Sequence, residues 1–189
     1  YYFSNRSKIY SNRVVELYLK DKMKENLKDY ILHLNNWVPK NIIDKSILEL
    51  SDNKTWQRHT YSNSKTFKKS SKNKNKELDV CYGNNLTHLK QIYDLTWKAL
   101  EKYIVIDKIS GNTFQGWKGF SQLRFNRYKK GQIMSRHSDH IVSLFTMFDD
   151  YEIKFKAGDL IIFPSVFLYP HLVKPVKKGT RYSFVSWAW

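Results

Sequence analysis

The sequence predicts an α+β domain, in which helices from the first half of the chain pack on a sheet, barrel or jelly roll formed by the second half. The chain has 189 residues, about the size of one domain, and 41% of them are apolar, enough for one sizeable core. Apolar residues recur at helical steps up to residue 103, whereas short alternating runs follow residue 114. Helices followed by strands are typical of helices packed on one sheet.

Three stretches have the apolar period of an amphipathic helix. The first covers residues 13–34 and ends at Trp37-Val38-Pro39, because the residue before a proline avoids the helical region. The second covers residues 40–50. The clearest is residues 85–103, which a Gly83-Asn84 turn precedes.

A basic segment separates the second and third helices. Residues 54–76 are rich in Lys, Ser and Asn and contain no acidic residue, and residues 62–75 have no apolar period. We expect a solvated, mobile loop here. It is either an ordinary surface loop or a lid that closes on an anionic peptide or another substrate.

The second half of the chain reads as strands. Its runs are rich in aromatic and β-branched residues, alternate between apolar and polar, and are separated by Gly and Lys turns. No internal repeat is visible. The expected strands lie within residues 121–128, 132–137, 151–155, 160–163, 171–175 and 182–189.

The charge balance suggests a nucleic-acid partner, but the composition weakens that interpretation. Lys and Arg number 33 against 17 Asp and Glu, a net charge of +16. Most of the cations are Lys, whereas base and phosphate recognition favours the Arg fork. A genome rich in A and T codons would produce the same charge.

No apolar stretch reaches the roughly 18–20 residues of a membrane helix, none opens the chain as a secretory signal, and the lone Cys81 suits a reducing compartment.

Residues with metal-ligating chemistry gather in the strand-rich half. His137 and Asp139 are two residues apart, so on a strand their side chains share one face. A His from a distant strand, His171, completes a two-His, one-carboxylate set. That set leaves coordination positions open, as in non-haem Fe(II) oxygenases. His140 is an alternative member, although three residues from His137 it faces the other side of an extended strand.

One arginine follows the same pattern. Arg181 lies ten residues after His171 and starts the last strand-like run. An Arg inside a barrel needs an anion, because an unpaired buried guanidinium is very costly, and a carboxylate matches its fork. The alternative is an ordinary salt bridge at a strand end.

These residues resemble the Fe(II)/2-oxoglutarate-dependent dioxygenases, in the prolyl 4-hydroxylase branch, and in particular the small prolyl-hydroxylase-like proteins of marine bacteriophages. The resemblance covers about residues 29–189 and is strongest in the strand-rich half. The matching strings are residues 126–131 leading into 134–140, residues 158–165 and residues 179–187.

The resemblance implies a fold and a division of the chain. The fold would be a double-stranded β-helix, or jelly roll, with the N-terminal helices packed on the sheet. The whole chain, 1–189, would be a single domain: a possible N-terminal extension (1–28), helical support with the mobile basic loop (29–110) and the catalytic β-helix core (111–189).

The implied activity is that of a peptidyl-prolyl 4-hydroxylase similar to procollagen-proline 4-dioxygenase, which couples oxidative decarboxylation of 2-oxoglutarate to hydroxylation of proline in a peptide or protein. The reaction would need Fe(II), 2-oxoglutarate and O2, with ascorbate as an optional reductant. A phage origin would place the protein in the cytoplasm of a bacterial host. By resemblance, His137, Asp139 and His171 would bind Fe(II), and Arg181 and Tyr128 would bind the cosubstrate.

By the same resemblance, Trp187 would lie at the substrate; for it and for Tyr128, simple core packing is the alternative. Apolar walls around the site are expected from Phe125, Phe163, Phe184 and Trp187.

Three alternatives remain beside this hypothesis. Nucleic-acid dealkylases of the same fold carry a second Arg six residues after the first, where this chain has Trp187. A catalytically inactive binding module is disfavoured by the intact ligand set and Arg181. Hydroxylation of a free amino acid stays open.

The interval between the predicted ligands Asp139 and His171 is short. Only 31 residues lie between them, where the family fold has about four strands. The sequence therefore predicts a missing segment near residues 141–146, or else a true deletion.

Overall fold

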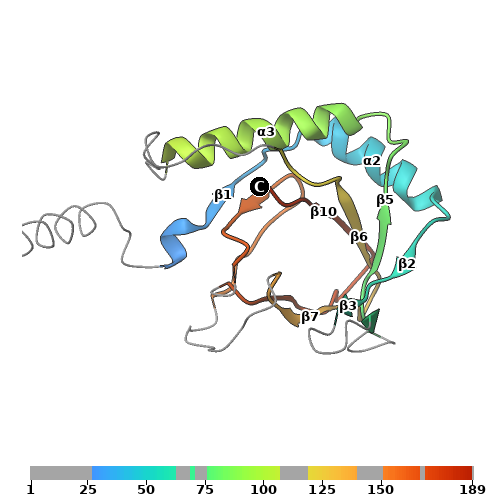
Figure 1. Ribbon diagram of the computed structural model, residues 1–189. Coiled ribbons are helices and arrows are strands. Elements are labelled where there is room, and N and C mark those ends of the chain that lie inside the picture. Colours follow the sequence, from blue (N-terminus) through green and yellow to red (C-terminus); the bar gives the residue numbers. More distant parts are fainter. Residues whose placement is uncertain are drawn as a thin grey trace, which may run out of the picture.

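The computed structural model describes residues 27–62, 69–70, 76–106, 119–139, 151–166 and 169–188 (Figure 1). Two α-helices lie along one side of the molecule, and the strands curve around an interior next to them. The helical elements are the 3-10 helix η1 (Leu27–Tyr30), α2 (Lys40–Asp52) and α3 (Leu89–Ile106). The strands are β1 (Leu32–Leu34), β2 (Gln57–Arg58), β3 (Tyr61–Ser62), β4 (Lys69–Ser70), β5 (Asp79–Tyr82), β6 (Arg124–Tyr128), β7 (Met134–His137), β8 (Leu160–Ile162), β9 (His171–Val173) and β10 (Arg181–Val185).

The strands pair in antiparallel fashion throughout the described part of the chain. The largest sheet has four strands in the order β10-β6-β5-β2, and three further pairs are β1-β8, β3-β4 and β7-β9. The predicted mixture of helices and antiparallel sheet is confirmed. The closed double-stranded β-helix topology, and the predicted division of the chain into an extension, a support and a core, stay predictions.

The two α-helices bury one face each against the four-stranded sheet. On α2 the buried residues Ile42, Ser46 and Leu50 are four apart, which places them on one stripe of the helix. Together with parts of α3 and the sheet they form a helix-side core, made up of Val38, Ile42, Leu50, Cys81, Leu86, Ile92, Leu123 and Phe125. Both helices were predicted from their apolar period, and both are confirmed, with ends shifted by a few residues.

Strand β6 separates this core from the interior of the molecule. Phe125 belongs to the helix-side core, and Arg127 stacks on Trp56, which packs against the same core. Because successive side chains on a strand point to opposite faces, Arg124, Asn126 and Tyr128 face the interior. Tyr128 packs there with Leu78 and Met134, in a second cluster.

Gly158 makes the turn before β8 and could not be another residue. Its φ is +94°, which L side chains rarely adopt, and a Cβ at this position would lie 3.0 Å from the Val38 carbonyl oxygen. Its own carbonyl accepts a hydrogen bond from the Val38 N–H at 2.8 Å. The next residue, Asp159, accepts from the Asn36 and Lys156 N–H groups, which holds its pKa down at about 2. This turn therefore ties β8 to the segment between β1 and α2.

The first predicted helix is wrong where the structure describes it. Residues 27–30 form the 3-10 helix η1, and residues 32–34 form strand β1, which pairs with β8. Residues 32–34 alternate between apolar and polar, so they fit a strand as well as a helix. Pairing with a distant strand then decides for the strand. Residues 13–26 of that prediction lie outside the described part.

Two other local predictions need correction. The basic segment 54–76 is not simply a solvated loop: residues 57–58 pair with β5, residues 61–62 pair with 69–70, and His59 is buried. Residues 151–155 were expected to form a strand and form none. The predicted missing segment near 141–146 lies outside the described residues and stays a prediction.

None of the helices in the described ranges is long and apolar enough to cross a membrane.

Candidate metal centre

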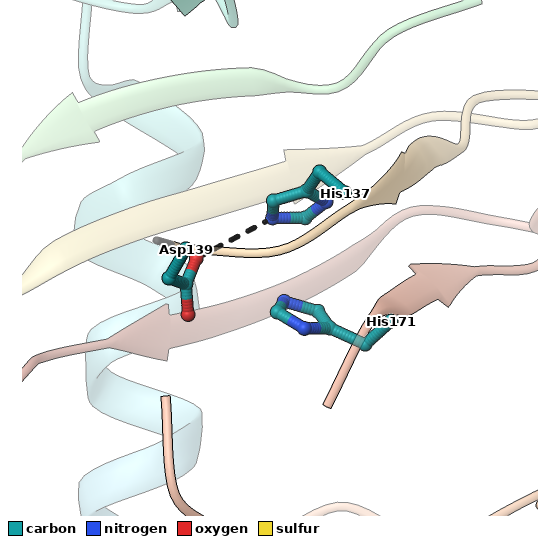
Figure 2. Close-up of side chains that lie close together, drawn as sticks. All are labelled: His137, Asp139 and His171. Carbon is teal, nitrogen blue, oxygen red and sulfur yellow. Dashed lines mark ion pairs between the residues drawn. The ribbon is translucent and has the colours of Figure 1, made fainter. Parts of the chain in front are cut away.

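Two histidines meet across a strand pair. β7 and β9 are antiparallel, and their register sets His137 directly opposite His171. Side chains at such positions start only about 4.5–5.5 Å apart. The two ring centroids are accordingly 4.3 Å apart, and both rings point into the same space (Figure 2). The strand register thus brings together two ligands that are far apart in sequence.

Asp139 completes the group from just beyond the end of β7. Its Oδ1 lies 3.6 Å from His137 Nε2 (Figure 2). One ligand atom from each of His137, Asp139 and His171 lies within 4.8 Å of the others, and no other such group occurs in the described ranges. Metal–ligand distances of about 2.0–2.2 Å let a single ion bridge atoms up to about 4.4 Å apart, which is close to this limit. The three predicted ligands therefore converge as a metal site requires.

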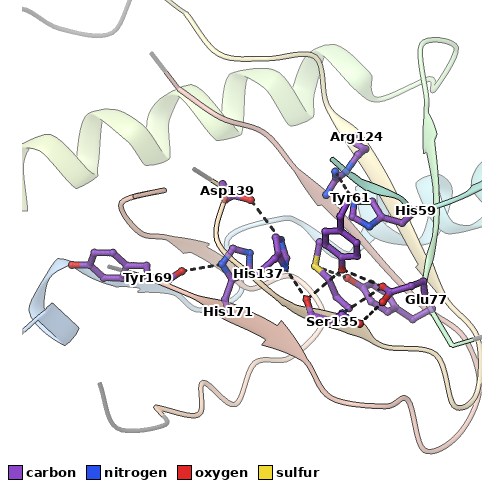
Figure 3. A network of polar contacts seen from close by, with 11 residues as sticks. His59, Tyr61, Glu77, Arg124, Ser135, His137, Asp139, Tyr169 and His171 are labelled. Carbon is purple, nitrogen blue, oxygen red and sulfur yellow. Dashed lines mark hydrogen bonds and ion pairs between the residues drawn. The ribbon is translucent and has the colours of Figure 1, made fainter. Parts of the chain in front are cut away.

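Each histidine is oriented by its own stretch of backbone. His137 Nδ1 lies 2.9 Å from the Ser135 carbonyl oxygen, and His171 Nδ1 lies 3.1 Å from that of Tyr169 (Figure 3). A carbonyl can only accept, so each Nδ1 must carry the proton and donate it. Each Nε2 then has a free lone pair, the state in which a neutral imidazole binds a metal.

The protonation states also suit a cation. Burial, followed by the charges of His137 and Arg124, lowers the pKa of His171. For Asp139 burial raises the pKa, but the hydrogen bond with His137 and the charge of His171 outweigh it and the net pKa is lowered. These shifts favour neutral imidazole at His171 and an ionised carboxylate at Asp139, the forms in which the two groups bind a metal.

A buried carboxylate supports His137 from behind. Glu77 is fully buried and accepts hydrogen bonds from the Tyr61 hydroxyl at 3.1 Å, from the Ser135 N–H at 3.4 Å and from the Ser135 hydroxyl (Figure 3). Ser135 is the residue whose carbonyl holds the His137 ring. Glu77 therefore holds Ser135 in place, and the Ser135 carbonyl in turn orients the His137 ring. The sequence reasoning missed Glu77 and Tyr61, because they lie in or beside the segment that was read as a solvated loop.

Arg181 and Tyr128 face each other across β10 and β6. They are direct partners in the register, the guanidinium lies 4.2 Å from the Tyr128 ring centre, and its charge opposes the burial that raises the pKa of Tyr128. Arg181 Nε is buried with no hydrogen-bond partner, and no carboxylate pairs with Arg181 in the described ranges. The ordinary salt bridge weighed for Arg181 is therefore not found there. Its orphaned donor fits a bound anion.

The aromatic residues divide between the site and the core. The Trp187 side chain lies near enough to the Asp139 carboxylate to help lower its pKa, and the Phe163 ring centre lies 5.2 Å from that of His171. Phe125 and Phe184 instead belong to, or pack on, the helix-side core, so they are not walls of the site as predicted. Both lie on the opposite strand face, because their registers place them one residue away from inward-facing positions.

Arg124 and His59 are further site residues that the sequence reasoning missed. Arg124 lies over the Trp187 ring at 5.1 Å, and its Nη1 is 3.3 Å from His59 Nε2 (Figure 3). Six buried side-chain atoms in the described ranges have no hydrogen-bond partner. Four belong to this inner region, namely Arg124 Nε, Asn126 Oδ1, Arg181 Nε and His59 Nδ1, and the other two, Ser46 Oγ and Arg127 Nε, lie on the helix side. Alternation along β6 would have identified Arg124, since it shares a face with Tyr128.

The remaining described histidines take no part. His33 lies 3.0 Å from the Asp159 carboxylate at the turn before β8, and His59 and His88 are absent from the cluster. His140 is outside the described residues.

Comparison with known proteins gives a fold and no family. No protein-family model matches the sequence, and no curated protein matches it. Among solved structures, the chain is similar to the viral collagen prolyl hydroxylase vCPH from Paramecium Bursaria Chlorella virus-1. Its complex with 2OG aligns with a TM-score of 0.51 and 13% identity, over 84% of this chain and 94% of that one. A truncated form aligns with a TM-score of 0.51 and 14% identity, over 84% and 88%. The chain thus has a prolyl hydroxylase-like fold, with antiparallel sheets and few helices.

Proposed function

We propose that this protein is an Fe(II)/2-oxoglutarate-dependent dioxygenase that hydroxylates proline in a peptide or protein. The observation that carries the proposal is the convergence of His137, Asp139 and His171, with an anion-accepting Arg181 on the same interior. The metal would be held by His137 Nε2, His171 Nε2 and the Asp139 carboxylate. We further propose that the strands close as a double-stranded β-helix around this interior.

The donor set fits Fe(II). Two imidazoles and one carboxylate are the ligands of non-haem iron oxygenases, and they leave positions for a cosubstrate and O2. Fe(II) with 2-oxoglutarate and O2 supplies an oxidant for an unactivated C–H bond, in a reaction that releases succinate and CO2 and places one oxygen atom on the substrate. Ascorbate is a suitable reductant for the assay.

The residues of the chain would bind and orient these groups. The carbonyls of Ser135 and Tyr169 keep both Nε2 atoms deprotonated and aimed inward. Arg181 would form the bidentate pair with the distal carboxylate of 2-oxoglutarate, helped by the Tyr128 hydroxyl. Burial raises the pKa of Tyr128, although Arg181 opposes it, so this hydroxyl keeps its proton and remains a donor.

A prolyl substrate is supported by two observations. The viral protein of the same fold is named a collagen prolyl hydroxylase, and its structure is a 2OG complex. In this chain Trp187 lies beside Asp139, where an indole could pack on a proline ring.

The test is a succinate-release assay with Fe(II), 2-oxoglutarate and ascorbate, over matched peptides that contain proline or alanine. Proline peptides should stimulate turnover and gain one oxygen atom by mass. Asp139→Ala should abolish both, whereas the exposed-helix variant Lys90→Ala should change neither. Stimulation by a methylated oligonucleotide alone would instead favour dealkylation, and stimulation by free amino acids alone would favour the small-molecule alternative.

A further inference from the structure

Arg124 has no ion-pair partner in the described ranges, and the Asp139 carboxylate acts on its charge only from beyond ion-pair distance. It lies on the inner face of β6, its Nε is buried without a hydrogen-bond partner, and no carboxylate there comes within ion-pair distance of it. Burial lowers the pKa of its guanidinium, which means that the charged form is poorly solvated. A desolvated guanidinium is retained only at a cost to stability.

Its two neighbours cannot balance this charge. Burial, and then the charge of Arg124 itself, lowers the pKa of His59 to about 4, so His59 is neutral at pH 7 and offers only its Nε2 lone pair. Trp187 offers only its ring face. By contrast Arg127, on the outer face of the same strand, pairs with the Asp79 carboxylate at 3.2 Å. Both arginines have a buried Nε without a hydrogen-bond partner, but among the described residues only the outer one, Arg127, has a carboxylate partner.

Arg124 and Arg181 occupy opposite ends of one strand pair. Arg181 is opposite Tyr128 in the register, whereas Arg124 is opposite Val185. Four residues separate the two levels, or about 13 Å along the strand. Arg181 lies against Tyr128 and Phe155, and Arg124 lies against Trp187, which is near the Asp139 carboxylate. A carboxylate bound at Arg181 therefore leaves Arg124 available for a second anion.

We infer that Arg124 binds a carboxylate of the substrate itself, beside Trp187 and the metal ligands. The inference rests on the proposed function and deepens it, because it restricts the substrate to one that carries a carboxylate close to the reacting proline. A planar carboxylate matches the guanidinium fork, and His59 and Trp187 bound the position on two sides. The carboxylate is either the terminal one of a free or C-terminal proline, or the side chain of an adjacent acidic residue.

The experiment measures binding in the absence of turnover. Protein loaded with Ni(II) and 2-oxoglutarate is titrated by calorimetry with two matched pairs. The first pair is N-acetyl-Ala-Pro with a free or an amidated C-terminus; the second is N-acetyl-Pro-Glu-amide and N-acetyl-Pro-Gln-amide. In one pair the carboxylate member should bind about 10- to 100-fold tighter than its amide, the range of a charge-assisted hydrogen bond. Which pair shows the difference identifies the source of the carboxylate.

The variants then assign this preference to Arg124. Arg124→Gln should reduce the carboxylate preference to about twofold or less, and Arg124→Lys, which keeps the charge without the fork, should retain part of it. Lys129→Gln removes the same charge from the exposed turn after β6 and should keep the full preference. Equal binding of carboxylate and amide in both pairs by the wild type would overturn the inference without any variant. A folded Arg124→Gln protein that keeps the full carboxylate preference would also overturn the inference. So would a methylated oligonucleotide that binds the wild type more tightly than either peptide pair and no longer binds Arg124→Gln.

Failure of the inference can be told from failure of the proposed function. Binding of Ni(II) and 2-oxoglutarate is measured first, without peptide, and its absence would reject the dioxygenase proposal. The same peptide pairs are then titrated into the metal-free protein, with Trp fluorescence as the readout. A carboxylate preference of the metal-free protein that depends on Arg124 would still support the anion site. The absence of such a preference would reject the anion site.

Discussion

Replacing Arg181 by Met should leave the ligand-free protein as stable as the wild type or make it more stable, while 2-oxoglutarate binding is lost. Met has a similar length and no charge. The wild-type Nε is buried without a partner, and relieving an unsatisfied buried group is worth about 1–3 kcal/mol. The lost contact with the Tyr128 ring, at 4.2 Å, opposes this by about 0.5–2 kcal/mol. The middle of the two ranges gives a gain in the free energy of unfolding of about 1 kcal/mol, and their limits run from a loss of about 1 to a gain of about 2.5 kcal/mol.

The affinity of Arg181→Met for 2-oxoglutarate should fall, and by more free energy than its stability changes. Two charge-assisted hydrogen bonds at about 1.5–3 kcal/mol each correspond to a 2-oxoglutarate Kd that rises about 100- to 10,000-fold in Arg181→Met. Arg181→Lys keeps the charge but loses the fork and should lie in between. Affinity for Mn(II), followed by its paramagnetic effect on water relaxation, should stay unchanged in both variants.

The assays are urea denaturation and calorimetry, with Arg127→Met as the matched control. Arg127 lies on the paired strand and also has a buried Nε without a partner, but it pairs with Asp79 and stacks on Trp56. Its replacement would leave the Asp79 carboxylate without this partner, so it should destabilise the protein and leave cosubstrate binding intact. A destabilised Arg181→Met protein with normal 2-oxoglutarate affinity would refute the reasoning, because Arg181 would then be structural.

Three further predictions follow from the site. Asp139→Ala should lower the affinity for divalent metal by at least 100-fold with the fold intact, as measured by metal titration and circular dichroism; retained affinity would mean that Asp139 is no ligand. Glu77→Gln should weaken metal binding by about 10- to 100-fold, because the peptide that orients His137 loses its carboxylate acceptor, and Ser135→Ala should do so more mildly. The pKa of His59 falls from 6.5 to about 4 on folding, so the unfolded chain takes up its proton first as the pH drops. Stability from this group is complete above pH 6.5 and declines by about 3 kcal/mol toward pH 4, and His59→Phe should flatten that part of the denaturation profile.

Local patterns in the sequence predict the helices and strands whose formation depends on residues close together in the chain. Helices α2 and α3 have long apolar stripes, and β6, β7, β9 and β10 have alternation bounded by turns, so all of them were predictable. Residues 32–34 were not. Their three-residue strand exists because β8 lies beside them, and no local period shows a partner 126 or more residues away.

The same distinction holds for the site. His137 and Asp139 share a strand face through their spacing, and His171 and Arg181 follow from the chemistry of the ligand set. Glu77 acts through Ser135, across a contact between segments 58 residues apart, so no spacing in the sequence indicates it. Arg124 could not be predicted for a different reason. In a basic chain a single Arg indicates no site until the strand face on which it lies is known.

The two faces of β6 have an evolutionary consequence. Positions 124, 126 and 128 contact the interior, whereas Phe125 and Arg127 contact the helix-side core, so ligand preference and folding stability are encoded by alternate residues of one strand. Substitutions at 124 or 126 can therefore change what the protein accepts while the helices stay in place. Insertion of one residue within β6 would move the residues on one side of it to the opposite face, and so place interior residues on the helix-side core and core residues in the interior. We expect lineages of this protein to diverge here by substitution and to keep the length of the strand.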